Sequence, residues 1–152
     1  MKHRILAAFA LAAASSLNAQ APIADLSYVA PIAGNWSYAA TTDGSEARFA
    51  DPSGNPQLWI HCTRATRQLS IAKAASAAAP FINVWTSSLT RSVPSSFNPA
   101  TGRLTIALAA TDPLLDAITS SRGRIGFSVG TEPPLVLPPW PEASRVIEDC
   151  RA

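Results

Sequence analysis

Alternation of apolar and polar residues dominates the middle of the chain and predicts a β-rich fold. Leu58, Ile60 and Cys62 point to one face of the clearest predicted strand. Similar stretches bounded by turn residues predict further strands at residues 35–39, 46–50, 67–72, 81–86, 103–108, 124–129 and 134–138. Residues 92–102 are rich in turn residues, so they are predicted to connect two of these strands.

Two segments repeat apolar residues at helical spacing instead. Asp112 suits an N-cap and Pro113 the first helical position, so a short helix is predicted to begin there and to stop at Gly123. A second helix, at about residues 141–149, would carry Cys150 on the continuation of its apolar face. The order of elements predicts a mostly β fold, an antiparallel β-sandwich or flattened barrel with the C-terminal helix across it.

The apolar run at the beginning of the chain shows neither the alternation of a strand nor the spacing of an amphipathic helix. A short basic head is followed by the apolar residues 5–14 and a small-residue exit, the layout of a signal peptide over residues 1–19. Cleavage after Ala19 would leave Gln20 at the N-terminus. The apolar run would form a helix of about 15 Å, too short for a hydrocarbon core of about 30 Å. We therefore expect a periplasmic or secreted protein with no membrane span after cleavage.

Beyond the leader, the sequence predicts an extended N-terminal arm at residues 20–33 and a single β-rich domain at 34–152. The net charge of the whole chain is +2, and two of its basic residues lie in the leader. The remaining charges are balanced and scattered, without the basic stripe that binds phosphate backbones. Nucleic acid is therefore not an expected partner.

Cys62 and Cys150 are the two cysteines of the chain. In an oxidising compartment an even pair predicts a disulfide, which would tie the C-terminal helix to the sheet. A reactive thiol or half of a metal site are the alternatives. With no CxxC motif and His61 as the one histidine beyond the leader, we expect no metal and no cofactor.

The sequence offers no clear catalytic group. His61 adjoins Cys62 on a strand, so their side chains point to opposite faces, and there is no GxSxG motif. The carboxylates are spread over turn and capping positions, which leaves a small carboxylate-based hydrolase as an alternative only. We expect a protein that is not an enzyme.

One turn is a candidate for contact with a partner. Arg122 and Arg124 flank Gly123, and their guanidinium groups could hold an anionic partner. The alternative is structural: the arginines would neutralise the end of the preceding helix and pair with acids such as Glu132 or Glu148.

Aromatic residues allow two interpretations as well. Trp36, Trp59 and Trp85 lie on predicted strands, where tryptophan is usually part of the core. They could instead line a groove for sugar or lipid. The proline-rich residues 133–141 are predicted to form a protected edge strand whose Trp140 packs at the start of the last helix, with a polyproline ligand as the alternative.

Four short motifs carry a family resemblance: residues 34–36, the strand 58–62, the turn 121–124 and the ending 146–151. With them the chain resembles uncharacterised exported proteins of proteobacteria and, more distantly, the invasion-associated locus B family and the VasI accessory proteins of type VI secretion. The resemblance implies a periplasmic β-rich domain used for interaction, with no catalytic residue.

These observations predict a non-enzymatic periplasmic binding or accessory protein of the cell envelope, whose partner is an envelope or secreted protein. One alternative is an inhibitor of a cell-wall hydrolase, in which the arginine turn would enter an acidic cleft. The other is the small carboxylate-based hydrolase.

Overall fold

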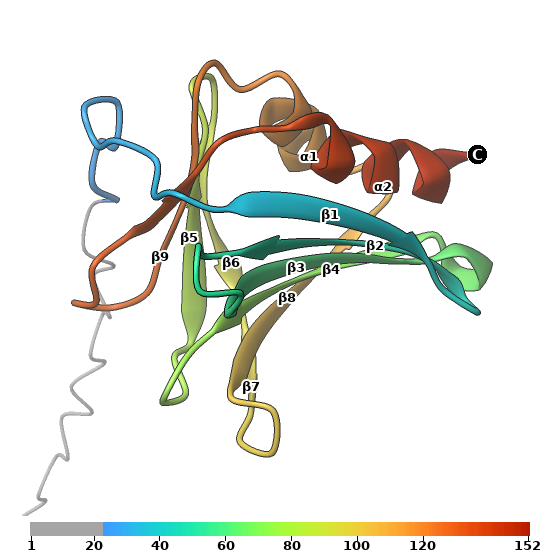
Figure 1. Cartoon of the computed structure of the whole chain (residues 1–152), viewed down its shortest axis with the longest axis horizontal. Helices are drawn as coiled ribbons and strands as arrows, with labels where there is room; N and C mark the ends of the chain where they lie inside the picture. Colours follow the sequence, from blue (N-terminus) through green and yellow to red (C-terminus); the bar gives the residue numbers. More distant parts are fainter. Residues whose placement is uncertain (1–22) are drawn as a thin grey trace, which may run out of the picture.

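The computed structural model describes residues 23–152, so the predicted signal peptide lies outside the described part. The described chain forms two antiparallel sheets and two α-helices (Figure 1). The larger sheet has the order β1-β2-β3-β4-β8-β7. Its strands are β1 (Asn35–Ala40), β2 (Gly44–Ala50), β3 (Pro56–Thr63), β4 (Gln68–Ala74), β8 (Arg103–Ala109) and β7 (Ser96–Asn98). The smaller sheet has the order β10-β9-β5-β6 and contains β10 (Leu135–Leu137), β9 (Ile125–Ser128), β5 (Phe81–Trp85) and β6 (Thr90–Pro94).

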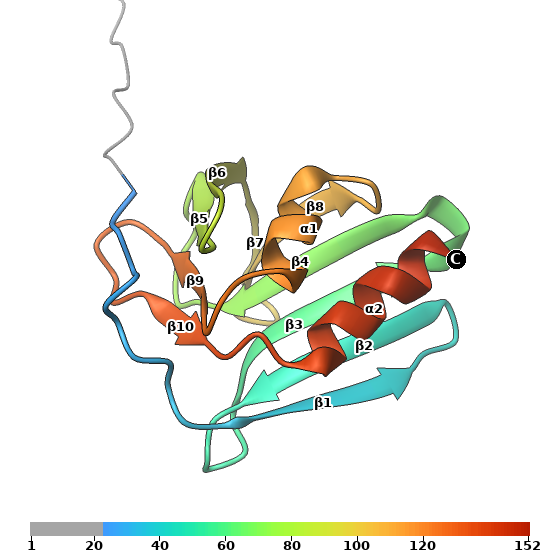
Figure 2. The same cartoon turned by 90° about the horizontal axis from the view of Figure 1, so that it is seen from above.

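The two sheets share one core, and their strands run at a steep angle to one another (Figures 1 and 2). Alternation along each strand places the apolar side chains on the inward faces. The largest fully buried side chains come from both sheets and from the helix α1 (Pro113–Thr119): Phe49, Leu58, Ile60, Leu69, Ile71, Ile82, Leu104, Ile106, Leu114, Leu115, Ile118 and Phe127. Both sheets are open, so the fold is a flattened sandwich and not a closed barrel. The predicted mostly β class is confirmed.

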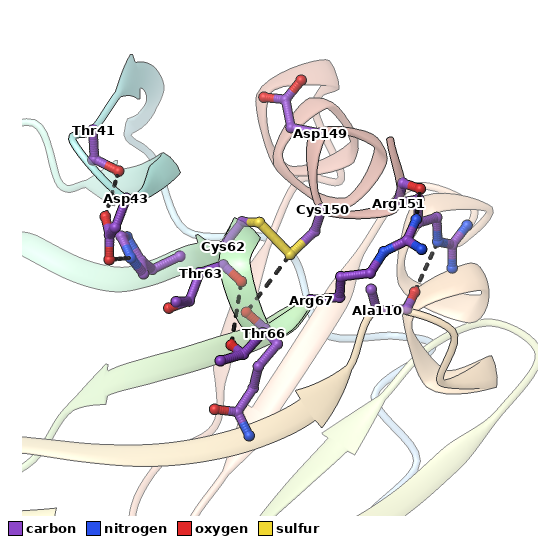
Figure 3. Close-up of a disulfide and its surroundings, with 12 residues drawn as sticks. Thr41, Asp43, Cys62, Thr63, Thr66, Arg67, Ala110, Asp149, Cys150 and Arg151 are labelled. Carbon is purple, nitrogen blue, oxygen red and sulfur yellow. Dashed lines mark hydrogen bonds and ion pairs between the residues drawn. A yellow bond between two sulfur atoms is a disulfide. The ribbon is translucent and has the colours of Figure 1, made fainter.

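The helix α2 (Pro141–Arg151) lies across the larger sheet (Figure 2). Its buried stripe consists of Ala143, Val146, Ile147 and Cys150, and Cys150 forms a disulfide with Cys62 on β3 (Figure 3). A hydrogen bond of 2.7 Å from the Tyr38 hydroxyl to Asp149 Oδ2 adds a polar contact. The predicted disulfide is therefore confirmed.

The predicted strands all form, with bounds shifted by at most two residues, but residues 92–102 were wrongly predicted as a connection. They contain part of β6 and all of β7, because Thr90–Pro94 pairs with β5 and Ser96–Asn98 pairs with β8. Serine and proline residues interrupt the apolar–polar alternation in this segment. Among residues 92–102, Val93 is the one apolar residue whose side chain is buried.

The helix α1 starts as predicted, with Asp112 Oδ1 accepting a hydrogen bond of 2.8 Å from the Leu114 N–H. It ends at Thr119 and not at Gly123. The Ser120 N–H and hydroxyl both donate to the Asp116 carbonyl, which closes the helix one turn early. Gly123, with φ at +75°, instead shapes the turn into β9.

The described part of the N-terminal arm packs on the outer face of the smaller sheet. Leu26 is buried against Trp85 and Val136, which point away from the main core. Gly126 leaves the space for Leu26, because a methyl group there would overlap Leu26 Cδ1. Further along, the Ile32 N–H donates to the Val136 carbonyl at 2.9 Å. The arm therefore forms a cover over this face.

The three strand tryptophans are buried, but in three different places. Trp36 belongs to the main core, where its ring meets Phe49 edge-on at 5.5 Å and its indole N–H donates to the Pro138 carbonyl at 2.8 Å. Trp85 lies under the arm. Trp59 lies on the face of the larger sheet that turns away from α2, because its neighbours Leu58 and Ile60 point inward. The three tryptophans are thus buried as predicted, but only Trp36 belongs to the main core.

Candidate functional site

The predicted arginine turn connects α1 to β9 and is built by two serines. The Ser87 N–H donates to Ser121 Oγ at 3.0 Å, and the Ser121 hydroxyl donates to the Arg124 carbonyl at 2.5 Å. The Arg122 N–H donates back to Ser87 Oγ at 3.0 Å. These bonds fix the backbone on both sides of Gly123.

Arg124 does not project from this turn. Its guanidinium donates to the carbonyls of Ser27 and Val29, the latter at 2.9 Å, and approaches the Leu26 carbonyl at 3.5 Å. Since a planar guanidinium can donate several hydrogen bonds at once, one side chain holds the whole turn of the arm. The prediction of an outward pair formed by Arg122 and Arg124 is therefore wrong for Arg124.

The alternative prediction, that these arginines pair with acids such as Glu132 or Glu148, is also not observed. Glu132 pairs with Lys73 at 3.2 Å, and Glu148 pairs with Arg151 at 3.4 Å. Arg122 is exposed, and its side chain forms no ion pair within residues 23–152. Of the two arginines among the predicted contact residues Arg122, Gly123 and Arg124, Arg122 alone presents a charge that is unpaired within residues 23–152.

The arm adds residues that sequence reasoning missed. Within residues 23–152, the exposed large apolar side chains are Tyr28, Val29, Ile32 and Trp140, so three of the four lie in five consecutive positions of the arm. Tyr28 is 94% exposed, while Leu26, two residues earlier, is 3% exposed. The Val29 N–H closes this turn by donating to the Leu26 carbonyl at 3.1 Å. The arm thus displays an aromatic side chain on a fixed turn.

The sequence of the smaller sheet does contain a signal that its outer face is covered. Trp85 and Val136 occupy outward positions of their strands, where an antiparallel sheet usually carries polar residues. Apolar residues on an outward face predict that another segment covers them. Nothing in the composition of the arm shows that Leu26 is the covering residue, because the arm has no periodic pattern.

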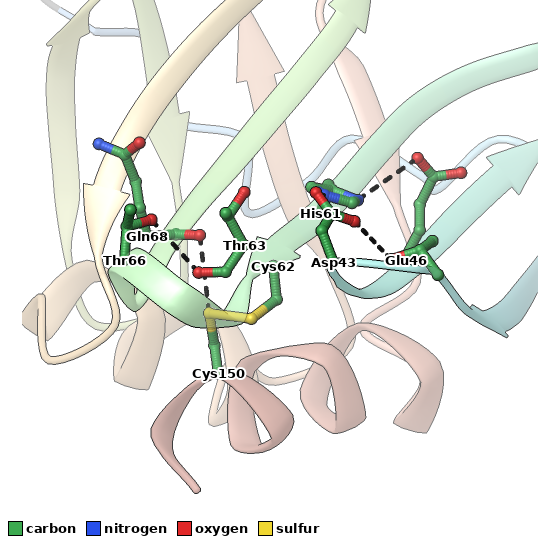
Figure 4. A network of polar contacts seen from close by, with 9 residues as sticks. Asp43, Glu46, His61, Cys62, Thr63, Thr66, Gln68 and Cys150 are labelled. Atoms are coloured by element: carbon green, nitrogen blue, oxygen red, sulfur yellow. Dashed lines mark hydrogen bonds and ion pairs between the residues drawn. A yellow bond between two sulfur atoms is a disulfide. The ribbon is translucent and has the colours of Figure 1, made fainter.

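His61 lies in a cluster with two carboxylates, those of Asp43 and Glu46 (Figure 4). Its Nε2 lies 3.0 Å from Asp43 Oδ2, and its Nδ1 lies 3.9 Å from Glu46 Oε2. The hydrogen bonds from Thr41 and from His61 lower the pKa of the Asp43 carboxyl. Glu46 is also paired with Arg48 at 2.8 Å. The two carboxylates therefore bind His61 and Arg48 from the sheet surface, and neither has the apolar surroundings of a general acid.

Several surface hollows could take small ligands. One, of about 400 Å³, lies between the β3–β4 turn and the end of α2 and is lined by Arg67 and Arg151, whose side chains Figure 3 shows. Arg67 donates to the Arg151 carbonyl, and Arg151 pairs with Asp116 at 2.7 Å. A second hollow of about 360 Å³ has Glu142 as its carboxylate, and a third of about 190 Å³ has Glu132. None of these three hollows combines two carboxylates.

Among residues 23–152, no group of three His, Cys, Asp or Glu side chains is arranged to hold a metal ion. Within the same residues, no helix has both the length and the apolar character needed to cross a membrane. The chain shows no significant match to any protein-family model, curated protein or solved structure. The resemblance to the locus B and VasI families therefore stays a prediction.

Proposed function

We propose that this protein is a non-enzymatic binding or accessory protein of the bacterial cell envelope, and that it contacts a partner protein through its N-terminal arm. The observation that carries the proposal is the almost complete exposure of Tyr28 on a turn whose neighbours are fixed. Tyrosine is enriched among the residues that dominate binding energy at protein interfaces. Fixing the turn before binding also reduces the entropy that association would cost.

The periplasmic or secreted location is part of this proposal. The disulfide between Cys62 and Cys150 supports it, because disulfides persist in oxidising compartments. The predicted leader at residues 1–19 supports it independently. Mass spectrometry of the exported protein would show an N-terminus at Gln20. An intact Met1, or protein retained in the cytosol, would contradict this location.

Site-directed photo-crosslinking in living cells tests the contact. A photoreactive amino acid replaces Tyr28 in one strain and Thr42, an exposed residue between β1 and β2, in the control strain. We expect a discrete crosslinked protein with the probe at position 28 and none with the probe at 42. Identical products from both positions, or none from position 28, would contradict the proposed contact.

Inhibition of a cell-wall hydrolase is the second candidate, and the free charge of Arg122 favours it. An unpaired arginine on a backbone fixed by Ser87 and Ser121 suits insertion into an acidic cleft. Purified protein would then inhibit a lysozyme in a cell-wall lysis assay, and Arg122→Ala would remove the inhibition. Equal inhibition by the wild type and the variant would exclude a role of Arg122.

A further inference from the structure

The side chains of Trp59 and Arg103 form an unusual pair on the open face of the larger sheet, the face away from both helices (Figure 1). The guanidinium carbon of Arg103 lies 3.7 Å from the centroid of the Trp59 ring. Trp59 is only 7% exposed although neither α1 nor α2 covers this face. Its burial therefore comes from its neighbours on the sheet surface, with Arg103 lying over the ring.

The strand register explains how the two side chains meet. Trp59 on β3 is opposite Ala72 on β4, and Ala72 is opposite Thr105 on β8. Arg103 precedes Thr105 by two residues, so it lies on the same face. The two strands are about 10 Å apart because β4 lies between them. The long side chains therefore meet above β4, where the small Ala72 leaves room for them.

This pair has buried hydrogen-bond donors without an acceptor. Trp59 Nε1 and Arg103 Nε are both inaccessible to solvent, and neither has a hydrogen-bond partner within residues 23–152. Buried N–H groups in proteins almost always have an acceptor, so two unpartnered donors in contact indicate a missing acceptor. None of the ion pairs formed within residues 23–152 involves Arg103. A guanidinium that is oriented by stacking and has no acid is suited to bind an oxyanion.

A second arginine lies beside the pair. Arg48 on β2 is directly opposite Trp59, with 48% of its side chain exposed. It is bonded to Glu46, which draws on only part of its five donors. Arg48 and Arg103 are therefore carried by strands on the two sides of the strand that carries Trp59, with β4 between Trp59 and Arg103.

The remaining residues of this face indicate what kind of anion it would take. The positions around the pair carry hydroxyl and amide groups, such as Gln57, Ser70 and Thr105. None of the exposed large apolar residues of the described chain lies on this face. A surface that carries hydrogen-bonding groups and no exposed large apolar side chain among the described residues suits a hydroxyl-bearing chain better than the apolar side chains of a peptide.

We propose that the open face of the larger sheet binds a carboxylate-bearing polysaccharide. Arg103 and Arg48 would bind the carboxylates, and the hydroxyl and amide side chains would bind the sugar hydroxyls. This site is on a different surface from the arm and does not depend on the proposed partner contact.

Titration with galacturonate oligomers, followed by calorimetry and by NMR of the indole and Arg Nε–H groups, tests the proposal. We expect the Trp59 indole N–H and the Arg103 Nε–H signals to move during the titration. Arg103→Lys, which keeps the charge but loses the planar fork, should bind about tenfold more weakly. Arg48→Ala should also weaken binding.

Controls separate this site from general attraction between charges. Arg64→Ala removes an exposed arginine between β3 and β4, on the side of Asp149 in α2, and should bind like the wild type. Neutral dextran of similar length should not bind. Unchanged affinity of folded Arg103→Lys, or absence of galacturonate binding, would overturn the proposal. Polyglutamate binding as tightly as galacturonate would overturn the assignment to a polysaccharide.

Discussion

The two ends of the described chain are attached to the two sheets by different means. At the C-terminal end, α2 is joined to the larger sheet by a covalent bond between Cys150 and Cys62 and by an apolar stripe along the helix. At the other end, the arm is attached to the smaller sheet by Leu26 and by the hydrogen bonds of Arg124. The first attachment is covalent and persists under oxidising conditions, whereas the second consists of non-covalent contacts, including the backbone hydrogen bond from Ile32 to Val136. Contacts of the second kind can therefore order a segment, such as the described part of the arm, that contains no helix or strand.

Removal of the covalent attachment should have the largest effect. The double variant Cys62→Ser, Cys150→Ser loses a crosslink across 88 residues of sequence, so unfolding should become easier by about 2–5 kcal/mol. Denaturant titration measures this loss, and hydrogen exchange should show α2 opening before the sheets. An unchanged denaturation midpoint would show that the helix is held by its apolar stripe alone.

Leu26→Ala tests the apolar half of the arm attachment. Leu26 is 3% exposed, and truncation of a buried leucine usually costs about 2–5 kcal/mol. We expect the lower part of this range, because the cover can partly collapse onto Trp85. Val29→Ala is the matched control on the exposed side of the same turn and should change stability by less than about 0.5 kcal/mol. Equal effects of the two substitutions in thermal melts would argue against the docked arm.

The two arginines of one turn give the sharpest pair of variants. Arg124→Ala should reduce stability by about 1–2 kcal/mol, because it removes charged hydrogen bonds to the arm and leaves carbonyls without donors. Arg122→Ala should leave the melting temperature unchanged, since the side chain is exposed and unpaired within the described residues. Similar losses for both would mean that Arg122 has a structural role as well.

Acid should weaken the fold at a third place, between the smaller sheet and α1. Burial raises the pKa of the Asp112 carboxyl, but hydrogen bonds from Arg91 and from the Leu114 N–H outweigh it and lower the pKa below 3.8. A carboxyl with a lowered pKa in the folded state stabilises the protein fully above its unfolded pKa. That contribution is lost as the pH falls through the folded pKa.

Asp112→Asn should therefore cost about 1 kcal/mol at about pH 7, and the difference from the wild type should shrink toward about pH 2. Melting curves of both proteins across this range measure the effect. A constant difference at all pH values would show that the charge of Asp112 is not involved. The disulfide does not titrate, so the attachment of α2 by Cys62 and Cys150 should be independent of this change.

The same comparison explains which features the sequence could predict. The strand around Ile60 and the apolar stripe of α2 have regular spacings, and the chain has two cysteines. Pattern and composition were therefore sufficient to predict these features. The arm attachment depends on Leu26 fitting beside Gly126, a contact between distant residues that leaves no periodic trace. Arg124 was misassigned for the same reason, because its acceptors are backbone carbonyls of the arm, and every residue has one.

Trp59 shows a different limit. Alternation correctly places its side chain on the other face of β3 from Leu58 and Ile60. The sequence alone does not reveal that neither α1 nor α2 covers that face. Its burial comes from Arg103, which is distant along the chain and lies two strands away in the sheet. A long cation can cover an aromatic ring by reaching across a small residue, and no local pattern records this.

The most direct test of the docked arm is amide hydrogen exchange at Val29 and Ile32. Both N–H groups donate to backbone carbonyls, of Leu26 and of Val136 respectively. We expect both amides to be protected in the wild type and to lose protection in Arg124→Ala, while the amides of α2 keep theirs. Unprotected exchange at both positions in the wild type, or protection unaffected by Arg124→Ala, would contradict an arm that is held in place by Arg124.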